Sequence, residues 1–291
     1  MRTKAPRADR LDKIRDITII VLKNNGHLTK IDLVQKIRNN LTPPQLNYWS
    51  ISNIREYVAA LEFLKLAFSL RSKMIYLTAS GTLLATKGIF GSPKLDEQEK
   101  QIFRQLIFQN QRFQVFLALF THGKVPKDLM EFLKIGESIR LKLGELETNL
   151  DRREVQDIFK SWALSTEIIE WNVTTNEFFP VMKQDIPLNE IFASILNAYD
   201  EVENRIIKRA EIYKIKDIVC QKHRIPCSQF YDSLIKASKE YSDRIRLEVV
   251  PITMMPLQKF KIEATERFGI VTQKGIYYYV KVLNSGGYHS E

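Results

Sequence analysis

The sequence has little cysteine, glycine and proline and no long hydrophobic run, and each shortage excludes a class of protein. Two cysteines, Cys220 and Cys227, among 291 residues are too few for a disulfide framework, so we expect a reducing compartment. The 11 glycines and 10 prolines exclude collagen-like and low-complexity chains and argue against a turn-rich β-sandwich. No apolar run approaches the roughly 18 residues of a membrane helix, so we expect a cytoplasmic protein without membrane contact.

The common catalytic motifs are also missing. The chain contains no Gly-x-x-x-x-Gly-Lys phosphate loop, no Gly-x-Gly-x-x-Gly dinucleotide loop and no Glu-x-Lys triplet of the kind found in metal-dependent nucleases. Gly275-Ile276-Tyr277 matches only the opening of one nuclease motif and is better interpreted as part of a strand. We therefore expect no catalytic residues, no enzyme activity and no cofactor, and a cryptic nuclease is the alternative to test.

The sequence contains only a weak candidate for a metal site. Cys220, His223 and Cys227 are three residues of the types that bind zinc, but zinc needs four ligands and no fourth residue stands nearby in the sequence. Cys220 lies among apolar helical positions, which predicts a core residue. The sequence predicts no metal.

Positive charge is present in excess and is unevenly distributed. The 44 Lys and Arg residues exceed the 34 Asp and Glu residues, which gives a net charge of +10. Residues 1–95 contain 16 of the basic residues and 6 of the acidic residues, so this third alone carries an excess equal to that of the whole chain. An excess of this size indicates a polyanionic partner, and its distribution assigns that partner to the first third.

Apolar spacing in the first third predicts three helices, a strand pair and a further helix. Leu11, Ile14 and Ile17 begin one helical pattern, and Ile31, Val34 and Ile37 mark the buried face of the next. A third helix is predicted from about residue 50, with its apolar face formed by Ile51, Ile54, Val58, Leu61 and Leu64. The segment FSLRSKMIYL fits two strands with a tip at 71–73, and a short helix follows.

This order resembles the winged helix-turn-helix superfamily over about residues 11–86. The segments that carry the resemblance are HLTKIDLVQKI, SISNIREYVAALEFLKL and SLRSKMIYLTASGTLL. The resemblance implies a third helix that enters the DNA major groove and a wing that contacts the backbone.

Weaker repeats of the pattern follow along the chain. We therefore expect a mainly α protein with small β-hairpins, that is, an α+β fold of tandem winged-helix domains. The predicted segments are a basic flexible arm (1–10), an N-terminal winged-helix domain (11–90), a central helical or degenerate winged-helix domain (91–186), a connecting helix (187–210) and a C-terminal winged-helix-like domain (211–291).

The DNA-binding residues are predicted from this resemblance and from charge. Ser52, Asn53, Arg55 and Glu56 lie on the polar side of the third helix, where Asn and Arg can pair with adenine and guanine. Cations suited to phosphates stand in the arm, at the start of the second helix and at the wing tip: Arg2, Lys4, Arg7, Arg10, Lys30, Arg71 and Lys73.

The function predicted from the sequence is non-enzymatic binding of double-stranded DNA in the cytoplasm, on the nucleoid. The tandem arrangement favours the recognition subunit of a larger DNA-targeting assembly of the restriction or defence type. In that case the central and C-terminal domains would contact a protein partner or a second copy. The alternatives are a dimeric transcriptional or plasmid-maintenance regulator and a scaffold that binds only protein.

Overall fold

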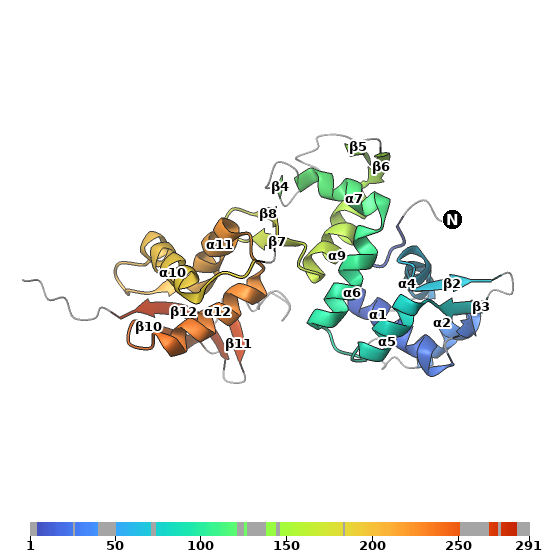
Figure 1. Cartoon of the computed structure of the whole chain (residues 1–291), viewed down its shortest axis with the longest axis horizontal. Coiled ribbons are helices and arrows are strands. Elements are labelled where there is room, and N and C mark those ends of the chain that lie inside the picture. The colour runs from blue at the N-terminus through green and yellow to red at the C-terminus, as the bar shows by residue number, and fades with distance from the viewer. Residues whose placement is uncertain are drawn as a thin grey trace, which may run out of the picture. The chain divides into compact units, whose positions relative to one another are not determined.

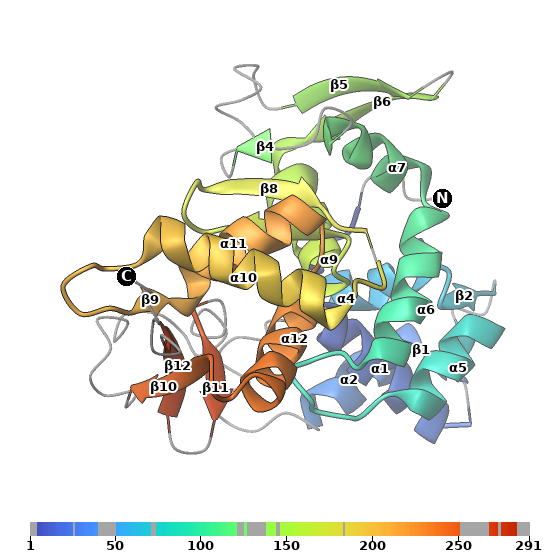
Figure 2. The ribbon, with the colours of Figure 1, turned by 60° about the vertical axis from the view of Figure 1, so that its left-hand side comes forward.

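The computed structural model of the chain combines helices with small antiparallel sheets, which confirms the α+β class. It describes residues 5–25, 27–39, 51–70, 74–120, 125–126, 138–143, 146–182, 184–250, 268–272 and 275–283. The chain divides into two units, Met1–Ile168 and Ile169–Glu291 (Figures 1 and 2).

Unit 1 begins with helices packed against a three-stranded antiparallel sheet. Its first elements are α1 (Leu11–Lys23), β1 (His27–Thr29), α2 (Lys30–Asn39), α4 (Ile51–Phe63), β2 (Ala67–Ser69), β3 (Met74–Leu77) and α5 (Ala79–Lys87). The sheet has the order β1-β3-β2, so β3 is central. Lys65, with φ of 57°, reverses the chain between α4 and β2, and the Thr78 side chain caps α5 by accepting from the Gly81 backbone N–H.

The buried face of α2 differs from the predicted one. Ile31 is 79% exposed, whereas Leu33 and Ile37 are buried. Leu33 and Ile37 are four residues apart and therefore form one stripe of the helix, which faces α1 and α4. Ile31, two positions before Leu33, points to the opposite side of the helix.

The remainder of unit 1 is a second group of helices with a hairpin. Its elements are α6 (Glu97–Phe108), α7 (Gln111–Leu117), η1 (Ala118–Phe120), β4 (Val125–Pro126), β5 (Ser138–Leu143), β6 (Leu146–Asp151), the π-helical η2 (Glu154–Phe159) and α9 (Lys160–Ser165). Phe113, Phe116 and Phe159 are fully buried with ring centroids 5.3 to 5.8 Å apart. Trp162 joins this core to α4 through Phe63, at 6.1 Å.

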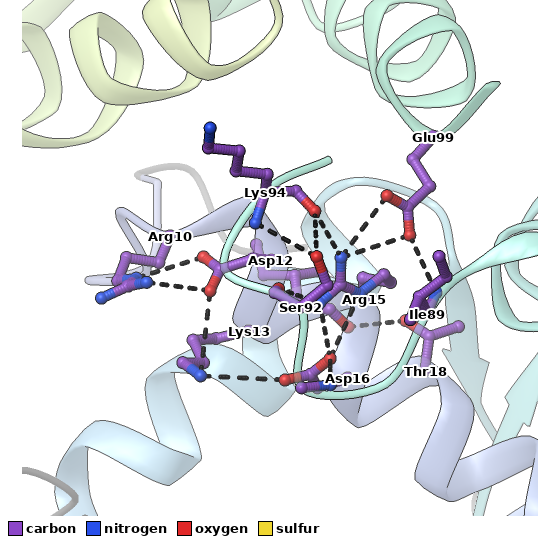
Figure 3. Close-up of polar contacts among 12 residues, drawn as sticks. Arg10, Asp12, Lys13, Arg15, Asp16, Thr18, Ile89, Ser92, Lys94 and Glu99 are labelled. Atoms are coloured by element: carbon purple, nitrogen blue, oxygen red, sulfur yellow. Dashed lines mark hydrogen bonds and ion pairs between the residues drawn. The ribbon is translucent and has the colours of Figure 1, made fainter. Parts of the chain in front are cut away.

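The segment after α5, which contains the predicted domain boundary, is fastened to α1 by the buried side chain of Arg15 (Figure 3). The Arg15 guanidinium donates to the backbone oxygens of Ser92 and Lys94 and to both carboxylate oxygens of Glu99, at 3.3 and 3.4 Å. Glu99 also forms a capping box with Asp96 at the start of α6. The predicted boundary at residues 90 and 91 therefore lies inside a continuous unit.

The part of the N-terminal arm that the structure describes, residues 5–10, is packed rather than flexible. Ala5 and Ala8 are 1% and 0% exposed. The Ala5 backbone N–H donates to Glu154 Oε1 at 2.8 Å, and Trp162 Nε1 donates to the Ala8 carbonyl at 2.7 Å. These bonds satisfy a buried carboxylate and a buried indole, which is the physical reason that the predicted free arm is ordered from residue 5.

Unit 2 begins with a hairpin and continues with three helices and a second sheet. Its elements are β7 (Ile169–Asn172), β8 (Glu177–Pro180), α10 (Leu188–Val202), β9 (Ala210–Glu211), α11 (Ile212–His223), α12 (Cys227–Glu240), β10 (Ile245–Val250), β11 (Ile270–Thr272) and β12 (Gly275–Val282). The hairpin turns at Asn176, with φ of 59°.

Two predicted boundaries fall inside unit 2. The β7–β8 hairpin, assigned from sequence to the central domain, packs with the C-terminal elements: Thr174 donates to Asp217, and the Cys227 backbone N–H donates to Glu170. Helix α10, predicted to be a connector, contributes Ile191, Phe192 and Ile195 to the same core as α11 and α12. The predicted central domain is therefore divided between the two units.

Within the residues that the structure describes, both units repeat one order of elements around a central strand. Unit 1 runs α1-β1-α2-α4-β2-β3, and unit 2 runs α10-β9-α11-α12-β10-β12 with β11 inserted before the last strand. In unit 1, β3 lies between β1 and β2. In unit 2, β12 pairs with β10 along one edge and with β9 and β11 along the other. The corresponding strand is thus central in both sheets.

Candidate nucleic-acid interface

Helix α4 has one face in the core of unit 1 and an opposite face open to solvent. Ile54, Tyr57 and Val58 are buried. Ser52, Asn53 and Arg55 are exposed, as the sequence predicted from the helical spacing. The exposed residues lie in the first turns of the helix, where a side chain can reach a ligand that approaches the amino end.

The amino end of α4 is electrostatically suited to an anion. The first turn contains no acidic residue. The partial positive charge of a helix N-terminus favours phosphate by about 0.3–1 kcal/mol at an exposed site. Arg55 adds a full positive charge one turn into the helix.

The ordered arm lies beside this face of α4. The Arg7 backbone N–H donates to Glu56 Oε2 at 2.8 Å, and Tyr57 Oη donates to Asp9 Oδ1 at 2.8 Å. Arg7 is exposed, and its backbone bond to Glu56 ties the arm to the α4 residue that follows Arg55. Glu56 is half-buried and holds the arm, a role that the sequence did not predict for it.

Two further predicted cations are paired with carboxylates at the surface. Arg10 makes a bidentate bond to Asp12 at 3.1 and 3.0 Å, and Lys30 Nζ lies 3.1 Å from Glu62. The side chains of Arg10 and Lys30 are 40% and 44% exposed. Exposed pairs contribute about 0–1 kcal/mol, so Lys30, whose partner Glu62 is 33% exposed, can exchange it for a phosphate at low cost. The partner of Arg10 is different, because the Asp12 side chain is only 7% exposed.

Four predicted residues, Arg2, Lys4, Arg71 and Lys73, lie outside the residues that the structure describes. Two exposed cations that sequence reasoning did not single out lie within them. Arg38 is in the last turn of α2, and Lys65 lies two residues after the end of α4. Their signal in the sequence is weak, because a lone Lys or Arg at a helix end is also the ordinary complement of the helix dipole.

The excess positive charge is distributed unevenly between the two units. Unit 1 contains 27 Lys and Arg against 18 Asp and Glu, and unit 2 contains 17 against 16. Nearly all of the excess positive charge therefore belongs to the unit that carries α4 and the arm, and unit 2 is close to neutral.

The three residues weighed as zinc ligands have other surroundings. Cys220 is fully buried, and this burial raises the pKa of its thiol. The His223 Nε2 atom lies 2.8 Å from Ser194 Oγ. Within the described part of the chain, no group of three or more His, Cys, Asp or Glu residues is placed to hold a metal ion.

A cavity of about 710 Å³ in unit 1 lies between α4, β2 and the junction of α6 with α7. Its lining combines Phe63, Phe68 and Leu106 with charged residues that include Glu62 and Arg112. Glu62 is paired with Lys30, and Arg112 with the buried Glu154 at 2.5 Å. These groups are committed to structural ion pairs rather than arranged as an acid and a base.

The described helices and the comparisons add two further findings. None of those helices combines the length and the apolar character needed to cross a membrane. No family model, no curated protein and no solved structure matches this chain.

Proposed function

We propose that the protein binds double-stranded DNA through unit 1, with α4 in the major groove. The observation that carries the proposal is the exposed face of α4, where Ser52, Asn53 and Arg55 stand at the amino end of a helix whose opposite face is in the core. Asn and Arg recognise adenine and guanine through paired hydrogen bonds, and each such contact discriminates between bases by about 1–3 kcal/mol.

The topology and the arm support this proposal. The described order α1-β1-α2-α4-β2-β3 with a central β3 is the order expected from the winged-helix resemblance, in which α4 would be the recognition helix. Arg7 beside α4, and Lys30 at the start of α2, are suited to phosphates on either side of the groove.

The experiment is selection of bound sequences from a random duplex library by the purified full chain, followed by fluorescence anisotropy with the selected site. We expect an enriched sequence and an affinity that falls steeply with salt, because several phosphates are neutralised. Binding to no duplex even at low salt would contradict the proposal and favour a scaffold that binds only protein.

The recognition subunit of a larger DNA-targeting assembly and a dimeric regulator would both use this surface. We infer the first role from the two-unit plan, in which the neutral unit 2 is available for a protein partner. Light scattering on the purified chain distinguishes them. A regulator is expected to be a homodimer on a palindromic site, and a monomer would favour the recognition subunit.

A further inference from the structure

The sheet of unit 1 has an inner face in the core and an outer face that carries a row of aromatic rings. In the register of the sheet, His27 of β1 lies opposite Tyr76 of β3, and Tyr76 lies opposite Phe68 of β2. Their neighbours on the other face are buried, since Ile75 is 0% and Ala67 3% exposed. The three rings therefore form one row, the aromatic row, across all three strands on the outer face.

The rings of the aromatic row are nearly parallel. The centroids of His27 and Tyr76 are 5.8 Å apart with an interplanar angle of 22°, and those of Phe68 and Tyr76 are 5.6 Å apart at 20°. Phe68 is 46% exposed, and Leu70, beyond the end of β2, is 53% exposed. Cross-strand aromatic pairs stabilise a sheet, but that role does not require a phenylalanine and a leucine to stay in water.

The surroundings of the aromatic row are basic. Lys65, two residues before β2, is exposed. The row also belongs to the unit that carries nearly all of the excess positive charge. Exposed parallel rings beside cations match the chemistry of unpaired nucleic acid, whose bases stack on aromatic side chains while its phosphates meet Lys and Arg.

We propose that the aromatic row binds single-stranded nucleic acid by stacking unpaired bases on Phe68, Tyr76 and His27. This site is separate in its residues from the exposed face of α4, which the proposed function assigns to duplex DNA. Stacking does not require a particular base, because every base has a π-face, so the site is expected to tolerate many sequences.

The experiment measures fluorescence anisotropy of a labelled oligothymidylate, about 10 nucleotides long, with the full chain and its variants. We expect Phe68→Leu and Tyr76→Leu each to weaken binding about 5- to 100-fold, because leucine keeps apolar area but not the ring. Phe68→Trp, which keeps a ring, retains binding. Phe90→Leu is the matched control, since Phe90 is 44% exposed and lies outside the sheet.

Three results would overturn the proposal. They are no binding of the oligothymidylate at low salt, equal losses in Phe68→Leu and Phe90→Leu, and equal weakening of a duplex and of the single strand by Phe68→Leu. Thermal unfolding of each variant shows whether the sheet remains folded, and the Phe68→Trp variant tests the site without removing its ring. A failure here leaves duplex binding by α4 intact, because the duplex is measured separately.

Discussion

Arg15 shows, at the scale of single residues, why the first ninety residues do not form a separate domain. Its guanidinium is fully buried and is shared among Asp16, Glu99 and two backbone carbonyls. Sequence reasoning could not assign this role, because the partners other than Asp16 lie 77 to 84 residues further along the chain. The helical spacing indicates only that Arg15 is a polar residue on α1.

Replacing Arg15 tests this account. We expect Arg15→Ala to lower the free energy of unfolding of unit 1 by about 3–5 kcal/mol, because it leaves the buried carboxylate of Glu99 without its cation. Lys30→Ala is the control, since both side chains of the Lys30–Glu62 pair are exposed, at 44% and 33%, and its cost should stay under about 1 kcal/mol. Urea unfolding followed by circular dichroism measures both; equal costs would contradict the buried network.

His223 gives unit 2 a predicted dependence on pH. Burial lowers the pKa of His223, and the neighbouring Lys222 acts in the same direction. As pH falls below the unfolded value of about 6.5, the unfolded chain takes up the proton before the folded chain does, so stability decreases. His223→Gln should make the free energy of unfolding less dependent on pH between 7 and 5. Parallel pH curves for the variant and the wild type, measured by urea unfolding, would show that His223 plays no part.

At the scale of elements, amphipathic helices and the local β2–β3 strand pair could be predicted from the sequence, and strand β1 could not. Most of the buried face of α4 follows from its spacing, because a helix places residues three and four apart on one face, but Ile51 at its amino end is 44% exposed. Strand β1 has only three residues, so its local pattern is weak. It is stabilised by pairing with β3, which lies far along the chain, and one segment of sequence does not show that pairing.

The two parts of the N-terminal arm, residues 2–4 and residues 5–9, are expected to play different roles. Residues 5–9 pack against α4, η2 and α9, while Arg2 and Lys4 are predicted to contact phosphates. Deleting residues 2–4 should leave stability unchanged and reduce the salt slope of duplex binding by about 2, one for each lost cation. Anisotropy titrations over a range of salt measure this slope, and an unchanged slope would contradict the prediction.

Deleting residues 2–9 is the companion variant. It also removes the Ala5 donor to Glu154 and the Ala8 acceptor of Trp162, so we expect a further loss of stability on the order of 2–4 kcal/mol. If the longer deletion unfolds at the same urea concentration as the shorter one, the packing of the arm contributes nothing to stability.

At the scale of the whole molecule, one order of elements appears twice but the charge does not. Helix α12 occupies in unit 2 the place of α4 in unit 1, and its exposed residues include Asp232 and Glu240 as well as Lys236 and Lys239. The sequence revealed the charge asymmetry by counting. It did not reveal the division at residue 168, because that division depends on contacts such as Arg15 with Glu99 and Glu170 with Cys227.

The central claim is that α4 reads duplex DNA, and Arg55→Ala tests it most directly. Affinities for the selected site and for a random duplex are measured by anisotropy at one salt concentration, with Lys236→Ala on α12 as the matched control. We predict that Arg55→Ala weakens the selected site by about 5- to 100-fold more than the random duplex, and that Lys236→Ala changes neither. Equal losses on both duplexes, or equal effects of the two variants, would contradict the account.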